Sequence, residues 1–240
     1  VVISAMGKTT NALEKIVAAY MEGKKEEALS LFQQIKNQHQ EAAKFLTTLQ
    51  WKETEAQLTR FYTEVEWILH DTPQQSYDYY YDQIVCCGEM LSSTLVYMHL
   101  KEAGARVSWL DIRDVIRTDN QFRDPSVNWS LTETNTRNII APLFETTDII
   151  ITQGFVGCTD ENESTTLGRE GSDYTAAILA TCLQADSVTI WKDVESVMNA
   201  DPRRFTDAQK ISHLNYAEVI EMAFYGAQVI HPKTIKPLRN

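Results

Sequence analysis

Long apolar runs, cysteines and basic tracts are all scarce in this chain of 240 residues, and each shortage excludes a class of protein. The longest apolar runs, such as 149–151 with its neighbours, are far too short to cross a membrane. The four cysteines lack the C-x2-C spacing of a zinc site and are too few for a disulfide scaffold. We therefore expect the chain in the reducing cytoplasm. No linker rich in Pro, Gly or Ser interrupts the sequence, which favours one domain.

Acidic residues outnumber basic ones by 33 to 22, which gives a formal net charge of −11. An acidic chain without a basic tract is a poor match for non-specific nucleic-acid binding. We expect neither nucleic acid nor a membrane among its partners. A phosphate site remains compatible with this charge, because a few local cations and backbone amides can build one.

The apolar pattern changes at Gly104, which divides the chain into a helical part and an alternating part. Apolar residues spaced three and four apart predict helices over residues 13–21, 24–49, 58–69 and 84–98. Strand-like runs then alternate with helical segments, in the order 107–111, 148–153, 172–184, 187–191, 216–225 and 228–230. This order predicts an α/β domain with a mainly parallel central sheet, helices on both faces and a helical insertion between its early strands.

Ligands of parallel sheets collect where strands end, and polar loops follow the predicted strands. The most informative loop covers residues 165–174, in which two threonines, two glycines, Arg169 and the pair Ser172-Asp173 precede a helix. Exposed amides and the helix dipole make such a turn an anion site, and Arg169 suits a carboxylate or a phosphate. The alternative is that Ser172 only caps the helix and Arg169 is solvated.

Three other polar positions are open to two interpretations each. Asp193 follows a predicted strand and could bind a ribose or an amine, while Arg203 further along the loop could bind a phosphate. Both residues could equally belong to a solvated loop held by an Asp-Pro turn. Glu89 lies beside Gly88 on a helix with otherwise apolar residues. It is either a paired structural charge or a ligand for a substrate amine.

Several motifs in a fixed order resemble the catalytic domain of aspartate kinases, which have the amino acid kinase fold. They are Ser4-Ala5-Met6, Gly88-Glu89-Met90, Ile151-Thr152-Gln153-Gly154-Phe155, Thr166-Leu167-Gly168-Arg169, Gly171-Ser172-Asp173-Tyr174, Asp201-Pro202-Arg203 and Phe224-Tyr225-Gly226-Ala227 with His231-Pro232. The resemblance covers essentially the whole chain and identifies residues 1–240 as the catalytic domain. It implies a three-layer α/β sandwich around an eight-stranded, mainly parallel sheet. The implied reaction transfers the γ-phosphoryl group of MgATP to the β-carboxylate of L-aspartate, giving 4-phospho-L-aspartate for lysine, threonine and methionine biosynthesis.

The resemblance also implies a role for individual residues. It assigns Arg169 to the substrate α-carboxylate and Glu89 to the α-amino group. The residues implied to line the aspartate and catalytic centre are Ser4, Thr10, Ser172 and Asp173. Those implied to bind the nucleotide are Lys192, Asp193, Met198, Arg203 and Gln228. Three of these depart from the common pattern, which has Thr at Lys192, Tyr at Met198 and, in many members, Lys at Gln228.

The resemblance further implies segments that this sequence does not contain. A Lys-Phe-Gly-Gly strand is expected upstream of Val1, and ACT regulatory domains are expected after the His-Pro motif. We therefore expect the chain to be part of a longer, homo-oligomeric enzyme and to have little activity by itself. Mg2+ is expected to bind chiefly to the ATP phosphates and not to protein ligands. Two alternatives remain, a kinase for another acid such as glutamate or a carbamate, and a binding or assembly module without turnover.

Overall fold

The computed structural model describes residues 1–194, 196–201, 203–226 and 230–239. The first part of the chain forms β1 (Val2–Ile3), α1 (Thr9–Met21), α2 (Lys25–Leu46), α3 (Trp51–His70), α4 (Tyr77–Val85) and α5 (Cys87–Glu102). The middle forms β2 (Val107–Leu110), α6 (Trp129–Asn135), a π-helical turn (Thr136–Ile140), α7 (Ala141–Leu143) and β3 (Ile149–Gln153). The last part forms β4 (Val156–Cys158), β5 (Ser164–Thr166), α8 (Gly171–Leu183), α9 (Tyr216–Phe224) and α10 (Pro232–Leu238).

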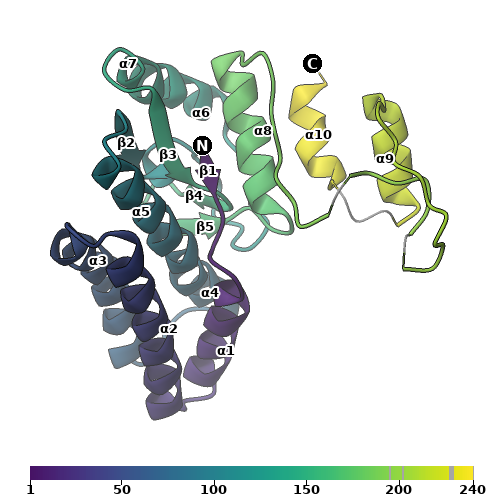
Figure 1. Cartoon of the computed structure of the whole chain (residues 1–240). Helices are drawn as coiled ribbons and strands as arrows, with labels where there is room; N and C mark the ends of the chain where they lie inside the picture. The colour runs from purple at the N-terminus through teal and green to yellow at the C-terminus, as the bar shows by residue number, and fades with distance from the viewer. Residues whose placement is uncertain (195, 202, 227–229, 240) are drawn as a thin grey trace.

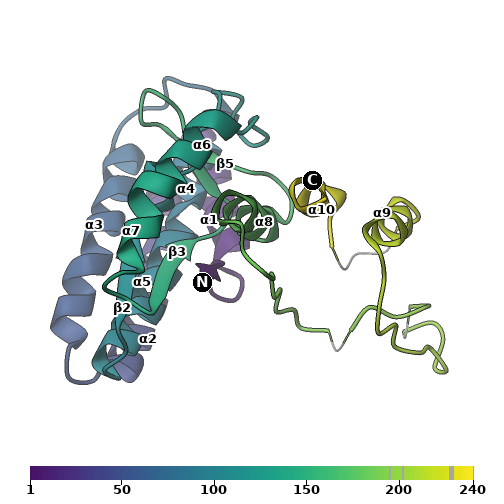
Figure 2. The same cartoon turned by 90° about the horizontal axis from the view of Figure 1, so that it is seen from above.

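The sheet that organises the fold has three parallel strands in the order β1-β3-β2. Strand β3 is central, with Thr152 opposite both Val2 of β1 and Leu110 of β2. Helix α5 packs on one face of the sheet and α8 on the other (Figures 1 and 2). Strands β4 and β5 form a separate antiparallel hairpin. The α/β class, the parallel sheet and the helical insertion between β1 and β2 are confirmed.

The insertion is a helical block with its own apolar core. Ile16 of α1, Phe32 of α2 and Leu58 of α3 are almost completely buried, and the ring of Phe32 meets that of Tyr62 edge to face at 6.2 Å. Burying each of these side chains contributes about 1.5–3 kcal/mol. The block therefore gives α4 and α5 a firm support beside the sheet (Figure 1).

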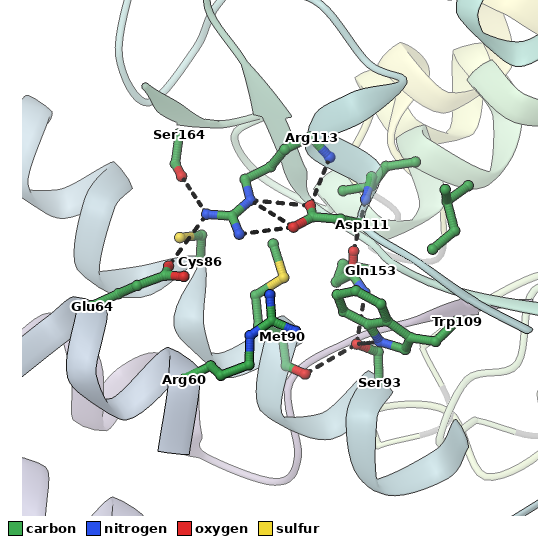
Figure 3. Close-up of polar contacts among 12 residues, drawn as sticks. Arg60, Glu64, Cys86, Met90, Ser93, Trp109, Asp111, Arg113, Gln153 and Ser164 are labelled. Carbon is green, nitrogen blue, oxygen red and sulfur yellow. Dashed lines mark hydrogen bonds and ion pairs between the residues drawn. The ribbon is translucent and has the colours of Figure 1, made fainter. Parts of the chain in front are cut away.

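A polar network joins this block to the carboxyl ends of β2 and β3 (Figure 3). The Gln153 amide donates to Ser93 Oγ of α5 at 2.8 Å and accepts from the Ile112 amide at 2.8 Å. Arg113 forms a forked ion pair with Asp111, in which Nη2 and Oδ2 lie 2.8 Å apart. The same guanidinium also reaches Glu64 of α3 and Ser164 of β5. Because the forked pair is the stronger kind of charged hydrogen bond, this network fixes the strand ends against the insertion.

Two features differ from the predictions made from sequence, and a third falls mostly outside the described residues. The helix predicted over 84–98 is interrupted at Cys86. The hydrogen bond from the Cys86 amide to the Asp82 carbonyl oxygen is long there, at 3.5 Å. The strand predicted over 187–191 is wrong, because the alternating apolar pattern finds no neighbouring strand to pair with among the described residues. Two positions of the strand predicted over 228–230, 228 and 229, lie outside the described residues. Among the helices that the structure describes, none is long and apolar enough to cross a membrane.

Candidate active site

A cavity of about 890 Å³ lies at the carboxyl ends of β1 and β3, beside the amino end of α8. It is built from segments far apart in the sequence, including the turn after β1, helix α5 and the loop before α8. The structure brings together in its wall these residues singled out in the sequence: Ser4, Thr10, Glu89, Arg169, Ser172, Asp173 and Lys192.

Glu89 is a buried carboxylate in this wall, only 3% exposed. Its Oε1 accepts a hydrogen bond from the Ala5 amide at 3.2 Å, while Oε2 has no hydrogen-bond partner among the residues that the structure describes. Burial raises the pKa of Glu89 to about 8. Gly88 allows this close approach, since a Cβ there would lie 3.0 Å from the Cβ of Ala5. The free oxygen is suited to accept a hydrogen bond from a ligand cation such as an ammonium group.

The loop before α8 brings Arg169 to the same cavity. Two of its residues adopt left-handed backbone angles, Gly168 with φ +78° and Glu170 with φ +53°. Arg169, between them, is exposed and forms no ion pair with any other described residue. An unpaired guanidinium in a cavity wall is available for a carboxylate or phosphate in a forked arrangement.

The amino end of α8 packs closely against Gly154, the residue that follows β3. A Cβ on Gly154 would fall 2.4 Å from Oγ of Ser172, so the glycine is required for this contact. On the next residue, the amide of Phe155 donates to Oγ1 of Thr175 at 3.0 Å. The amino end of this 13-residue helix, with the positive end of its dipole, is thereby held at the cavity.

Lys192 contacts the amino end of α8 in the cavity wall. Its Nζ lies 2.6 Å from Oδ2 of Asp173 and 3.9 Å from Oε2 of Glu170. The Asp173 side chain is 14% exposed and that of Lys192 27%. The pair therefore places one cation beside the helix end, where phosphate oxygens could replace part of its contact with the carboxylates.

Of the other predicted nucleotide residues, the three that the structure describes are not brought to the cavity. Asp193 is exposed, and Met198 pairs across an isolated antiparallel bridge with Lys210. Arg203 is bound to Asp201 with Nε and Oδ1 3.1 Å apart, and its side chain is 87% exposed. Gln228 lies outside the described residues. Asp193, Met198 and Arg203 follow α8, in the segment that extends away from the sheet toward α9 (Figure 2).

Sequence reasoning missed several charged residues in the cavity wall. The guanidinium of Arg123 lies 4.4 Å from the ring centroid of Tyr81 and 3.1 Å from Oδ1 of Asp78. Lys233 of α10 donates to Oδ1 of Asp124 at 2.5 Å and to the carbonyl of Leu167 at 3.1 Å. Only the His-Pro start of α10 offered a signal in the sequence, because the loop around Arg123 has no motif.

Within residues 1–194, 196–201, 203–226 and 230–239, no group of three or more His, Cys, Asp or Glu side chains is placed to hold a metal ion.

Comparison with known proteins decides the family. The model of the amino acid kinase family matches residues 1–240. This chain belongs to the amino acid kinase family. Within the family it is similar to lysine-sensitive aspartokinase 3 of Escherichia coli, with 40% identity over 158 residues, or 65% of this chain and 34% of that protein.

Longer alignments give the same relationship. A chloroplastic bifunctional aspartokinase/homoserine dehydrogenase 2 of Zea mays is 31% identical over 249 residues, covering 99% of this chain and 26% of that protein. The crystal structure of E. coli aspartokinase III in complex with aspartate and ADP has a TM-score of 0.84 and 32% identity over 98% of this chain and 52% of that chain. The aligned parts thus cover about a third or less of these curated relatives, and about half of the E. coli aspartokinase III chain.

Proposed function

We propose that this chain is the catalytic domain of an aspartate kinase, which transfers the γ-phosphoryl group of ATP to the β-carboxylate of L-aspartate. The observation that carries the proposal is that the Glu89 carboxyl and the Arg169 guanidinium lie in one cavity wall, each without an ion-pair partner among the described residues. An α-amino acid presents an ammonium and a carboxylate, the two groups that these side chains bind. Similarity to an aspartokinase whose structure holds aspartate and ADP supports the choice of substrates.

The chemistry requires positioning more than covalent help from the protein. Held by both α-groups, aspartate leaves its β-carboxylate free to attack the γ-phosphorus. That carboxylate is ionised at neutral pH, so no general base is needed. A bond forms between a β-carboxylate oxygen and the γ-phosphorus, the bond from that phosphorus to the bridging oxygen breaks, and ADP leaves with the electron pair.

The charge on the transferred group is stabilised by donors around the amino end of α8. In this proposal the backbone amides of Ser172 and Asp173 and the hydroxyl of Ser172 face the phosphates. Asp173 holds Lys192 beside them, at 2.6 Å. ATP brings Mg2+ with it as part of the substrate. The loop residues Asp193, Met198 and Arg203 are proposed to contact the nucleotide.

The proposal is tested by titration and by turnover. We expect L-aspartate to bind to the chain, L-glutamate to bind at least about tenfold more weakly, and ADP to bind in the presence of Mg2+. Formation of 4-phospho-L-aspartate is measured by trapping it with hydroxylamine as the hydroxamate. Equal binding of glutamate would indicate a different acid substrate. Binding of both ligands by the intact protein without hydroxamate would indicate a module that binds without turnover.

A further inference from the structure

Asp82 is a completely buried carboxylate in α4 that does not belong to the cavity wall. Its Oδ2 accepts hydrogen bonds from the amides of Arg123 and Thr166, both at 2.9 Å. Its Oδ1 accepts a third from Oγ1 of Thr166 at 2.5 Å. One side chain therefore holds two segments that are far apart in the sequence. They are the loop after β2, which contains Arg123, and the end of β5 at Thr166.

Both segments held by Asp82 form the cavity wall. Arg123 and Thr166 line the cavity themselves, and Arg169 follows three residues after Thr166. The two segments also touch, because a Cβ on Gly168 would lie 3.2 Å from the carbonyl oxygen of Arg123. Asp82 thus lies behind the junction of the two walls and fixes each of them by a backbone amide.

A carboxylate is a costly choice for this position if only packing is required. No Lys or Arg forms an ion pair with Asp82 among the described residues, and burial raises its pKa to about 6 even though three hydrogen bonds act in the opposite direction. An apolar side chain of α4 would avoid the cost of desolvation but would leave both amides without an acceptor. The structural gain from Asp82 is therefore the placement of these two amides.

We propose that Asp82 is a positioning residue that sets the affinity for the amino acid substrate by fixing the turn that carries Arg169. This inference rests on the proposed function, because it takes the ligand of Arg169 to be the substrate α-carboxylate. Asp82 acts through the walls and not by contact, since it lies outside the cavity lining.

The next residue along α4 provides a matched control. The Gln83 amide donates to the carbonyl of Ser164 at 2.8 Å and accepts from the amide of the same residue at 3.0 Å. Gln83 therefore also attaches α4 to β5, but at the strand end away from Thr166, and its hydrogen bonds within the described part of the chain go to Ser164 and Tyr79 and not to the Arg123 loop. Loss of either side chain loosens α4 from β5, and only loss of Asp82 releases the cavity walls.

The experiment compares D82A, D82N and Q83A by titration with L-aspartate and with ADP. We expect D82A to weaken aspartate binding at least tenfold and ADP binding less than threefold. We expect D82N to restore aspartate affinity to within about threefold, because its Oδ1 can accept from both amides while its Nδ2 donates to the Thr166 hydroxyl. Q83A is expected to lower the thermal midpoint and to change aspartate affinity less than twofold. Unchanged affinity in D82A, equal loss in D82A and Q83A, or failure of D82N to restore binding would each overturn the proposal.

Amide hydrogen exchange separates this inference from the proposed function. In D82A the amides of Arg123 and Thr166 should exchange at least tenfold faster than in wild type, and in Q83A at the wild-type rate. If the wild-type protein binds no aspartate, the proposed function fails while exchange in D82A still reports whether Asp82 holds the walls. If D82A does not fold, wild-type exchange decides: aspartate should slow both amides at least threefold, and no slowing would refute the inference.

Discussion

The amide of Ala5 donates to Oε1 of Glu89 at 3.2 Å, joining the turn after β1 to a helix 84 residues later in the chain. This contact uses one oxygen of the carboxyl group, and the other, in the cavity wall, has no partner in the described part of the chain. The site therefore contains a carboxyl group that is held in place by the fold before any ligand arrives. Its protonation should respond to ligand binding.

We expect aspartate binding to release a proton at pH 7. Burial raises the pKa of Glu89 to about 8, so the free protein holds the carboxyl mostly protonated, and an ammonium ligand favours its ionised form. Calorimetric titration at pH 7 in buffers of different ionisation enthalpy should give release approaching one proton per aspartate. E89Q should release none and bind aspartate about tenfold or more weakly. Identical heats in all buffers would contradict the assignment of Glu89 to the ammonium.

The same group should make the protein less stable as the pH rises. The folded-state pKa of about 8 lies above the ordinary value of 4.5 for a glutamic acid, so the folded state binds this proton more tightly than the unfolded state. The free energy of unfolding then falls with rising pH across that window, by up to about 1.4 kcal/mol per pH unit. Urea unfolding at pH 6.5 and 8.5 should show a smaller fall in E89Q than in wild type, with E89Q the more stable at pH 8.5. An equal fall in the two proteins would contradict this.

Replacing Arg169 should affect the amino acid and not the nucleotide. R169A removes the forked charged hydrogen bond to the α-carboxylate, a loss of about 1.5–3 kcal/mol or roughly ten- to a hundredfold in aspartate affinity. ADP affinity should remain within about threefold. R137A is the control, because Arg137 is paired with Glu133 on an exposed helix face away from the cavity. Weaker ADP binding with unchanged aspartate binding would show that Arg169 binds phosphate instead.

Removing the charge of Lys192 should weaken nucleotide binding. In K192M the carboxylates of Asp173 and Glu170 lose their cation and repel the phosphates, so ADP affinity should fall about tenfold, or about 1.4 kcal/mol. K192R should retain most of the affinity. K8M is the control, since Lys8 lies in the turn before α1 but outside the cavity wall. Equal ADP affinity in K192M and K8M would exclude this role of Lys192.

Adding one methyl group at Gly154 should separate β3 from α8. The new Cβ in G154A would fall 2.4 Å from Oγ of Ser172, and overpacking of this kind costs about 1–3 kcal/mol in the free energy of unfolding. Aspartate affinity should fall as well, because the first turn of α8 must move. G23A also strains the chain, at a φ of +75°, but meets no atom within 4 Å. G23A should therefore lose stability while keeping aspartate affinity, and the same behaviour in G154A would be the contrary result.

The sequence predicted the helices and turns that form through residues close together in the chain. The spacing of Leu13, Ile16 and Val17 specifies a buried helix face, and these residues are fully buried in α1. Glycines and hydroxyls before Asp173 specify a turn followed by a helix, which the structure contains. Residues 187–191 have an alternating pattern too, but a strand needs a partner and the pattern does not specify one.

The missed parts of the site depend on tertiary contacts. Arg123 adopts a φ of +71° with its amide bound to Asp82, a conformation that nothing in its own segment indicates. Asp82 is itself hidden in a segment of tyrosines and acidic residues, where an aspartate ordinarily belongs to a solvated helix face. Its role follows from distant segments that fold back onto α4, which periodicity along one helix cannot reveal.

The order of the strands has a consequence for how the protein folds. The helices α1, α2 and α3 contact their neighbours in sequence. Strand β1, in contrast, pairs with β3, which follows the whole insertion and β2 in the chain. Local contacts form quickly and long-range strand pairing slowly, so the helical block can assemble while the sheet is still open. The cavity needs the turn after β1, α5 and the start of α8 together, and is completed last. A ligand that binds there therefore stabilises only chains that have finished folding.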